Sequence, residues 1–187
     1  MNTFTVILLA VAVALTTFPA FVNGGYLLGN EKAGLQGRFI LVMAMVQLLL
    51  VALGIILGLN VGRISESSNK IMSLSILMIV GLKVIFDSLR TKPQDKSFDT
   101  ADAKVLLLFA IAESIVPMAV AISVGLLAES FFKSWSIFII VLVPVFIAGF
   151  LLGKNIGAES LKMRTGPIGG LFLIAASLIM IINLIGY

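Results

Sequence analysis

The stretch Leu57-Gly58-Leu59-Asn60-Val61-Gly62 returns later in the chain as Leu152-Gly153-Lys154-Asn155-Ile156-Gly157, with the leucine, both glycines and the asparagine kept. Each copy lies at the end of the second of three membrane-length apolar runs, one set in residues 1–90 and the other in residues 104–187. An odd number of crossings in each half makes the second half enter the membrane from the opposite side. The sequence therefore predicts an all-α integral membrane protein, with six transmembrane helices arranged as two inverted three-helix repeats.

The composition excludes a soluble domain. Of the 187 residues, 60% are hydrophobic and only 12% are charged, too few to cover a surface that faces water. The mean hydropathy of +1.17 points the same way. A membrane helix needs about 20 apolar residues, and open strands would leave backbone groups unpaired in lipid. The six expected spans are Phe4–Val22, Phe39–Leu59, Ile71–Phe86, Val105–Leu127, Ser136–Leu152 and Ile168–Ile185.

Two residue types are missing from the chain. It has neither cysteine nor histidine, which excludes disulfides, thiolate metal sites and imidazole-based zinc or copper sites. The usual nucleophile–base pairs of enzymes cannot be assembled either, so we expect neither enzymatic activity nor a resident cofactor. Any metal chemistry must use oxygen ligands or a lysine, which favours hard cations.

The basic residues orient the expected bundle. Loops one, three and five carry nine of them, whereas loops two and four carry three. This bias places the nine in the cytoplasm and both termini outside it. The overall charge of +4 is thus a topology signal, and the loops lack the basic face with interleaved aromatic residues that nucleic-acid binding needs. The nine are Lys32, Arg38, Arg90, Lys92, Lys96, Lys104, Lys154, Lys162 and Arg164, and the three are Arg63, Lys70 and Lys133.

The chain is expected to form a single membrane domain over residues 1–187. The first repeat ends near residue 90, and a polar loop with charges of both signs, residues 87–104, joins it to the second repeat, residues 104–187. Such a loop is typical of a flexible cytoplasmic connector that lets one triplet move against the other, and equally of a passive tether. The segment Met1–Thr3 has no basic side chain, so the first run is expected to remain as a span and not to be a cleaved signal peptide.

Five polar side chains interrupt the apolar spans at a similar depth. They are Glu113, Gln47, Thr16, Thr17 and Ser114. Glu113 lies nine residues past Lys104, about 13 Å into the membrane at 1.5 Å per residue, where an ionisable group is costly unless it is paired, protonated or hydrated. Gln47 lies nine residues past Arg38 and should reach the same level. The five could form one cluster of oxygen atoms facing the bundle interior, with Glu113 as the candidate metal ligand.

Each of these residues also has a purely structural explanation. Serine, threonine and glutamine in membrane helices commonly hydrogen-bond across helix interfaces and hold a bundle together. Lys83, within the third span, either extends to the cytoplasmic interface or pairs with Glu113. Pro19 and Pro117 interrupt the first and fourth spans, and each frees a carbonyl one turn earlier. A transported cation and a neighbouring hydroxyl are the two candidate partners for such a carbonyl.

Glycines four residues apart recur at matching places in the two halves. Gly54 and Gly58 lie in the second span, and Gly149 and Gly153 lie in the fifth. Small residues at this spacing let helix backbones approach closely in a membrane. We therefore expect close packing of the repeat-related helices at these faces.

With six spans in two triplets and both ends outside, the chain resembles the MntP-type manganese efflux pump family of the LysE exporter superfamily. The resemblance runs the full length and is closest at Ala112–Val120 and Val80–Arg90. It implies a metal route that uses aspartates in the first and fourth spans, helped by an acidic residue in the second. The matching positions here carry Thr16, Val116 and Gln47, so the family's membrane aspartates are not retained.

Together these features predict a membrane efflux transporter of a divalent cation such as manganese, working by alternating access of the two repeats. Glu113 would bind the cation or exchange a proton, and the four neutral polar residues would supply further oxygens. Two alternatives stay open: a transport-impaired or repurposed relative with a structural or regulatory role, and an exporter of a small organic solute or amino acid. The expected location is the bacterial plasma (inner) membrane, with lipid and the transported solute as partners and a homodimer left open.

Overall fold

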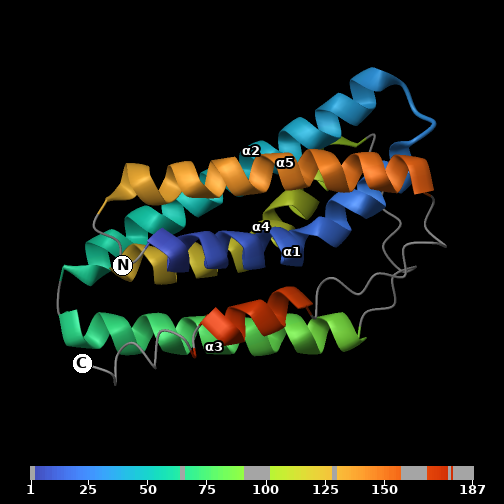
Figure 1. Ribbon diagram of the computed structural model, residues 1–187. Helices are drawn as coiled ribbons and strands as arrows, with labels where there is room; N and C mark the ends of the chain where they lie inside the picture. Colours follow the sequence, from blue (N-terminus) through green and yellow to red (C-terminus); the bar gives the residue numbers. More distant parts are fainter. Residues whose placement is uncertain are drawn as a thin grey trace.

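The computed structural model describes residues 3–63, 66–90, 102–127, 130–156, 168–176 and 178. In these ranges the chain is helical apart from short turns. Residues 168–176 form a sixth helical segment, and Figure 1 shows the helices gathered into an elongated bundle. The five long helices are α1 (Thr3–Leu28), α2 (Ala33–Gly62), α3 (Glu66–Arg90), α4 (Ala103–Leu127) and α5 (Phe131–Ile156).

The prediction of an all-α chain with membrane-length helices is confirmed. Each of the first five expected spans lies inside an observed helix, and all five helices are long and apolar enough to cross a membrane. The helices extend past the expected spans because helix continues through the polar flanks: α2, for example, begins at Ala33, six residues before Phe39. The sixth expected span is helical over 168–176. Apart from residue 178, its remainder lies outside the described residues, as does most of the connector 87–104.

Helices from the first half of the chain pack mainly on helices from the second half. α2 packs most extensively against α4, and α1 against α5, whereas α1 and α2 meet over a small area. α3 lies against α4, where the hydroxyl of Ser73 donates to the carbonyl oxygen of Ser123 at 3.0 Å. The segment 168–176 lies beside α3, as Figure 1 shows, and its Gly169 and Gly170 pack against α1 and α3 respectively.

Glycines bring two of these helix pairs into backbone contact. A Cβ on Gly58 would collide with the carbonyl oxygen of Ile122 and lie 2.7 Å from the Cα of Gly125, both on α4. A Cβ on Gly153 would collide with the carbonyl oxygen of Val22 on α1. Both glycine faces are thus closely packed, but the partners differ from the expected ones. The face on α2 packs on α4 and the face on α5 packs on α1, so each meets the first helix of the other half and not its own repeat-related helix.

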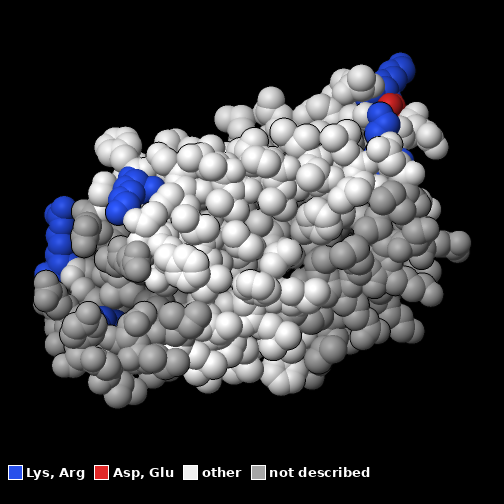
Figure 2. Space-filling view, viewed as in Figure 1, with Lys and Arg blue, Asp and Glu red and all other residues white. Residues whose placement is uncertain are grey.

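The surface suits a bilayer. Large apolar side chains point outward along α2 at four-residue spacing, at Leu41, Met45, Leu49 and Leu53. On the face drawn in Figure 2, charged residues gather at the two ends of the molecule and the band between them is uncharged. An uncharged apolar band between charged ends is what a hydrocarbon core flanked by headgroups requires.

The glycine packing makes a prediction about stability. Gly58→Ala should lower the free energy of unfolding by about 1–3 kcal/mol, because the added methyl group overpacks the contact between α2 and α4. Gly37, on the same helix, has open space where a Cβ would lie, so Gly37→Ala should leave stability unchanged or raise it slightly through helix propensity. The midpoint of thermal loss of the monodisperse size-exclusion peak in detergent measures both. Equal midpoints for the two variants would contradict the described contact.

Candidate functional site

Two polar side chains meet inside the apolar interior, where α1 passes α2. Gln47 has no exposed surface and Thr17 is 2% exposed. The side-chain nitrogen of Gln47, Nε2, donates to the hydroxyl oxygen of Thr17 at 3.4 Å. That hydroxyl in turn donates to the carbonyl oxygen of Val13 on its own helix at 3.1 Å. We call Thr17 and Gln47 the polar pair.

The side-chain oxygen of Gln47 is the chemically informative atom of the polar pair. Within the described residues, this buried Oε1 has no hydrogen-bond partner. A buried acceptor left unsatisfied costs roughly 1–3 kcal/mol, so the site favours an occupant that satisfies it, such as a water molecule, a proton donor or a cation. Hard cations accept amide oxygens as ligands, and the polar pair is therefore a candidate cation site.

The other two neutral residues expected in the cluster turn their hydroxyls to their own helices. Ser114 is 1% exposed, and its Oγ donates to the carbonyl oxygen of Ala110 at 2.6 Å. Thr16 is half-buried, and its Oγ1 donates to the carbonyl oxygen of Val13 at 2.7 Å. The methyl group of Thr16 lies against Gly169 of the sixth helical segment. Among the four neutral residues of the predicted cluster, the described hydrogen bonds thus link Gln47 to Thr17, whereas Thr16 and Ser114 bond to their own helices.

The two ionisable residues predicted within the spans lie outside the fully buried centre. Glu113 is half-buried on α4. Lys83 on α3 forms an ion pair with Asp87, one turn later on the same helix, with 2.6 Å between Nζ and Oδ2. The side chains of this pair are 57% and 58% exposed, so it contributes at most about 1 kcal/mol. From the sequence, Lys83 was expected either to extend to the cytoplasmic interface or to pair with Glu113. The structure shows it paired with Asp87. In the described part of the chain, no group of three or more carboxylates is placed to hold a metal ion.

The two prolines lie inside helices that continue past them. Pro19 is in α1 and Pro117 in α4. Pro19 has no N–H and therefore cannot donate to the carbonyl of Leu15, one turn earlier. Leu15 is two residues from Thr17. The carbonyl of Leu15 therefore lacks its usual helical donor, within one turn of the polar pair.

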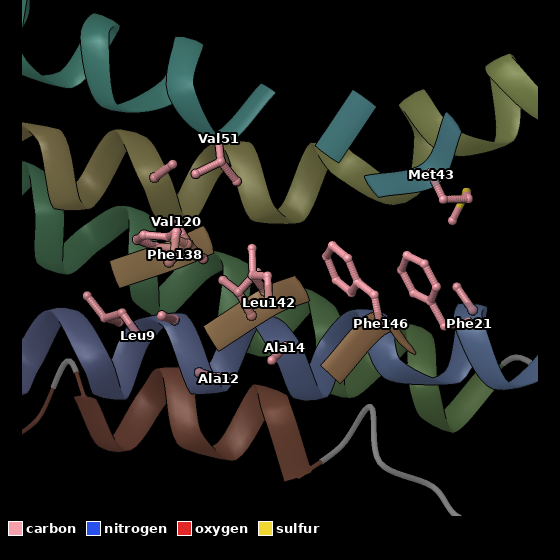
Figure 3. Close-up of a cluster of buried hydrophobic side chains, with 14 of the residues drawn as sticks. Leu9, Ala12, Ala14, Phe21, Met43, Val51, Val120, Phe138, Leu142 and Phe146 are labelled. Atoms are coloured by element: carbon pink, nitrogen blue, oxygen red, sulfur yellow. The ribbon is translucent and has the colours of Figure 1, made fainter. Parts of the chain in front are cut away.

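An aromatic cluster next to the polar pair was missed by the sequence analysis. The rings of Phe21 and Phe146 stack with centroids 4.2 Å apart and planes 7° apart, and Figure 3 shows them side by side. Phe39 meets Phe21 edge-on at 6.2 Å, and Phe150 lies 6.0 Å from Phe39. We call these four residues the phenylalanine cluster. The four-residue spacing of Phe146 and Phe150 places both rings on one face of α5. The sequence does not reveal which helices supply the other two rings.

A stability measurement separates a functional from a structural role for Gln47. Gln47→Met keeps the volume, loses one long hydrogen bond and removes a buried acceptor that has no partner in the described part of the chain. The free energy of unfolding should therefore fall by less than about 1 kcal/mol or should rise. Ser73→Ala is the matched control. It removes a buried hydrogen bond of 3.0 Å between α3 and α4, which should cost about 1 kcal/mol. Thermal midpoints in one detergent compare the two, and a larger loss for Gln47→Met would mean that Gln47 serves to hold the helices together.

Comparison with known proteins places the chain in a family. Its residues 31–181 match the Mntp family, described as "Putative manganese efflux pump". Proteins named "Putative manganese efflux pump MntP" are similar along nearly their whole length. The one from Parabacteroides distasonis is 27% identical over 170 residues, 90% of each chain. The one from Methanothermobacter thermautotrophicus is 25% identical over 187 residues, 100% of each chain.

A third such protein, from Bacteroides thetaiotaomicron, is 27% identical over 191 residues, 94% of each chain. No solved structure matches the chain significantly. The family match covers most of the sequence, including α2, α3, α4 and α5. The chain therefore belongs to the Mntp family.

Proposed function

We propose that this chain exports manganese, as Mn²⁺, across a membrane by alternating access between two inverted three-helix halves. The family match over residues 31–181 carries the proposal, and relatives named as manganese efflux pumps match 90% or more of the chain. The described bundle supports it with a polar pair buried in an apolar interior. Transport rather than catalysis suits a chain with neither cysteine nor histidine.

Matching contacts in the two halves support the inverted arrangement. Gly25 on α1 packs on the carbonyl oxygen of Phe150 on α5, and Gly125 on α4 packs on that of Ile55 on α2. Gly25 and Gly125 differ by 100 positions, and Ile55 and Phe150 differ by 95. The first helices of the two halves are thus related by one shift and the second helices by another.

A second set of contacts repeats both shifts. Gly153 packs on the carbonyl oxygen of Val22, again between α5 and α1, and Gly58 packs on that of Ile122, again between α2 and α4. Val22 and Ile122 differ by 100 positions, and Gly58 and Gly153 by 95. Agreement between independent contacts favours a common two-fold relation over chance similarity.

The third helices add a reciprocal contact. A Cβ on Gly81 of α3 would lie 3.2 Å from the carbonyl oxygen of Gly170, and a Cβ on Gly170 would lie 2.9 Å from the carbonyl oxygen of Gly81. The two glycines thus contact each other in the same way from both sides. Such a reciprocal contact is expected where a two-fold axis passes between two related helices. Because each half has three helices, such an axis would lie in the membrane plane, as in transporters whose halves rock against each other.

The polar pair gives the proposed site its chemistry. Gln47 would bind the ion through Oε1, which lacks a hydrogen-bond partner among the described residues, and Thr17 would offer its hydroxyl oxygen. Both ligands are neutral, so they offset only part of the dehydration of a divalent cation. The ion would therefore keep some of its water, or take Glu113 as a carboxylate ligand that exchanges the ion for a proton. Weak binding suits a carrier, which must release its ion on the other side.

The charge distribution suggests the orientation. With nine basic residues in loops one, three and five against three in loops two and four, both termini would face away from the cytoplasm. The end of the bundle that holds the α1–α2 loop would then be cytoplasmic. In a bacterium this membrane would be the plasma membrane, and manganese would enter the site from the α1–α2 end.

Manganese accumulation in cells tests the proposal. Bacteria that lack their own manganese exporter should hold less manganese when they express this chain. Gln47→Met should slow export about tenfold, because losing one good ligand costs about 1.4 kcal/mol, and Glu113→Gln should also slow it. Glu31→Gln is the matched control, because it removes an exposed carboxylate in the α1–α2 loop and should export like the parent. Manganese per cell is measured by mass spectrometry at equal membrane levels of each variant.

The outcomes separate the parts of the proposal. If the parent chain reaches the membrane and leaves cellular manganese unchanged, manganese export is wrong, and the bundle must carry another solute or serve another role. If the parent exports manganese and Gln47→Met does so equally well, the function stands and the polar pair is not its site. If Glu113→Gln exports manganese like the parent while Gln47→Met does not, the carboxylate of Glu113 plays no part in the transport route.

A further inference from the structure

The phenylalanine cluster lies between the polar pair and the end of the bundle where α1 ends and α2 begins. We propose that this cluster is the gate that closes the transport route at that end, and that the described structure holds the gate shut. The existence of a route rests on the proposed function. The position of the gate rests on the rings themselves.

The cluster lies where such a gate is required. Phe21 is one turn beyond Thr17 along α1, and Phe39 is two turns before Gln47 along α2, so both lie on the α1–α2 loop side of the polar pair. Phe146 brings in α5 by stacking on Phe21. Phe21 and Phe39 have no exposed surface and Phe146 has 1%. Rings from three helices therefore fill the interior between the candidate site and this end.

The opposite end of the bundle has no such rings at the matching positions. Under the shifts of 100 residues between α1 and α4 and 95 residues between α2 and α5, each phenylalanine of the cluster matches a smaller residue. All four smaller residues are also buried, so the difference lies in the kind of side chain and not in exposure. The matches of Phe21, Phe39, Phe146 and Phe150 are Ala121, Ser134, Val51 and Ile55.

A polar clasp lies outside the cluster at the same end. The ammonium group of Lys154 on α5 donates to Oε1 of Gln36 on α2 at 3.2 Å. Nε2 of Gln36 donates to the carbonyl oxygens of Leu28, Gly29 and Glu31 at 2.9, 3.2 and 2.9 Å. The clasp thus ties together the same three helices whose rings form the cluster. Its Lys154–Gln36 bond is exposed, and exposed contacts of this kind are readily broken.

The contacts of the gate are suited to opening. A stacked ring pair is held by modest forces beyond the burial of its area, and a phenylalanine ring can swing aside by changing a side-chain rotamer. A rocking motion that separates α5 from α1 would part Phe146 from Phe21 and release Lys154 from Gln36 together. The rings and the clasp would therefore open as one unit.

Cysteine accessibility tests the gate without any use of manganese. The chain has no native cysteine, so a single Thr17→Cys reports on access to the polar pair. A membrane-impermeant, positively charged methanethiosulfonate reagent is applied to spheroplasts and to inverted vesicles. Glu31→Cys, in the exposed α1–α2 loop, identifies the preparation that presents this end to the reagent. In that preparation the reaction of Thr17→Cys should be slow, and Phe146→Ala should accelerate it about tenfold by removing the stack.

The matched control is Phe138→Ala. Phe138 is also a fully buried phenylalanine of α5, but it lies eight residues earlier, toward the other end, as Figure 3 shows. This change should leave the rate from the α1–α2 loop side unaltered. Phe146→Leu and Phe138→Leu, which keep most of the apolar volume, repeat the comparison should either alanine variant fail to accumulate in the membrane.

Two results would overturn the gate. One is equal labelling rates from the α1–α2 loop side for the Thr17→Cys chain with Phe146 intact and for the Thr17→Cys chain with Phe146 replaced. The other is equal acceleration by the Phe138 and Phe146 variants, which would indicate general loosening of the bundle. A failure of the proposed function would appear separately: the unmutated chain would not export manganese, while the labelling pattern of the Thr17→Cys chains would be as expected.

Discussion

The direct backbone contact of α2 with α4, and of α1 with α5, determines how the rest of the bundle is arranged. In a bilayer the lipid tails are as apolar as the helices, so the hydrophobic effect does little to join them, and close packing must do it instead. Gly58 against Gly125, and Gly153 against the backbone of Val22, supply that packing. Because these pairs are tight, α1 and α2 meet mainly where large or polar side chains bridge them. The polar pair and the phenylalanine cluster occupy that region.

The polar pair also explains how the chain could keep a cation route without the membrane aspartates of its family resemblance. Of the three positions that would carry acids, Val116 and Thr16 are half-buried, and Thr16 faces Gly169 and bonds its own helix. Gln47 alone among the three is fully buried, with an oxygen that lacks a partner in the described part of the chain. An amide oxygen at that position would bind a cation more weakly than a carboxylate and would stay neutral at every physiological pH. The proposed site is therefore a low-affinity one whose selectivity would come from size and hydration.

Local features of the sequence predicted much of the fold, whereas the partners of individual side chains depended on tertiary packing. The spans and the glycine faces follow from composition and helical spacing, and both were predicted. Depth along a helix was also calculable, which put Gln47 and Thr17 at one level. Which neighbouring helix each face meets was not calculable. Thr16 and Ser114 were therefore expected in the cluster, whereas their hydroxyls bond carbonyl oxygens of their own helices. The phenylalanine cluster escaped prediction because it combines α1, α2 and α5, and its formation depends on which helices pair across the halves.

The proposed function requires that this bundle alone moves manganese across a bilayer. Purified chain reconstituted into liposomes that contain a manganese-quenched dye tests it most directly, because no other transporter is present. Added Mn²⁺ should quench the dye faster than in protein-free liposomes, and Gln47→Met liposomes with the same protein content should respond more slowly. Quenching no faster than in protein-free liposomes, with the protein shown to be folded and inserted, would contradict manganese transport by this chain.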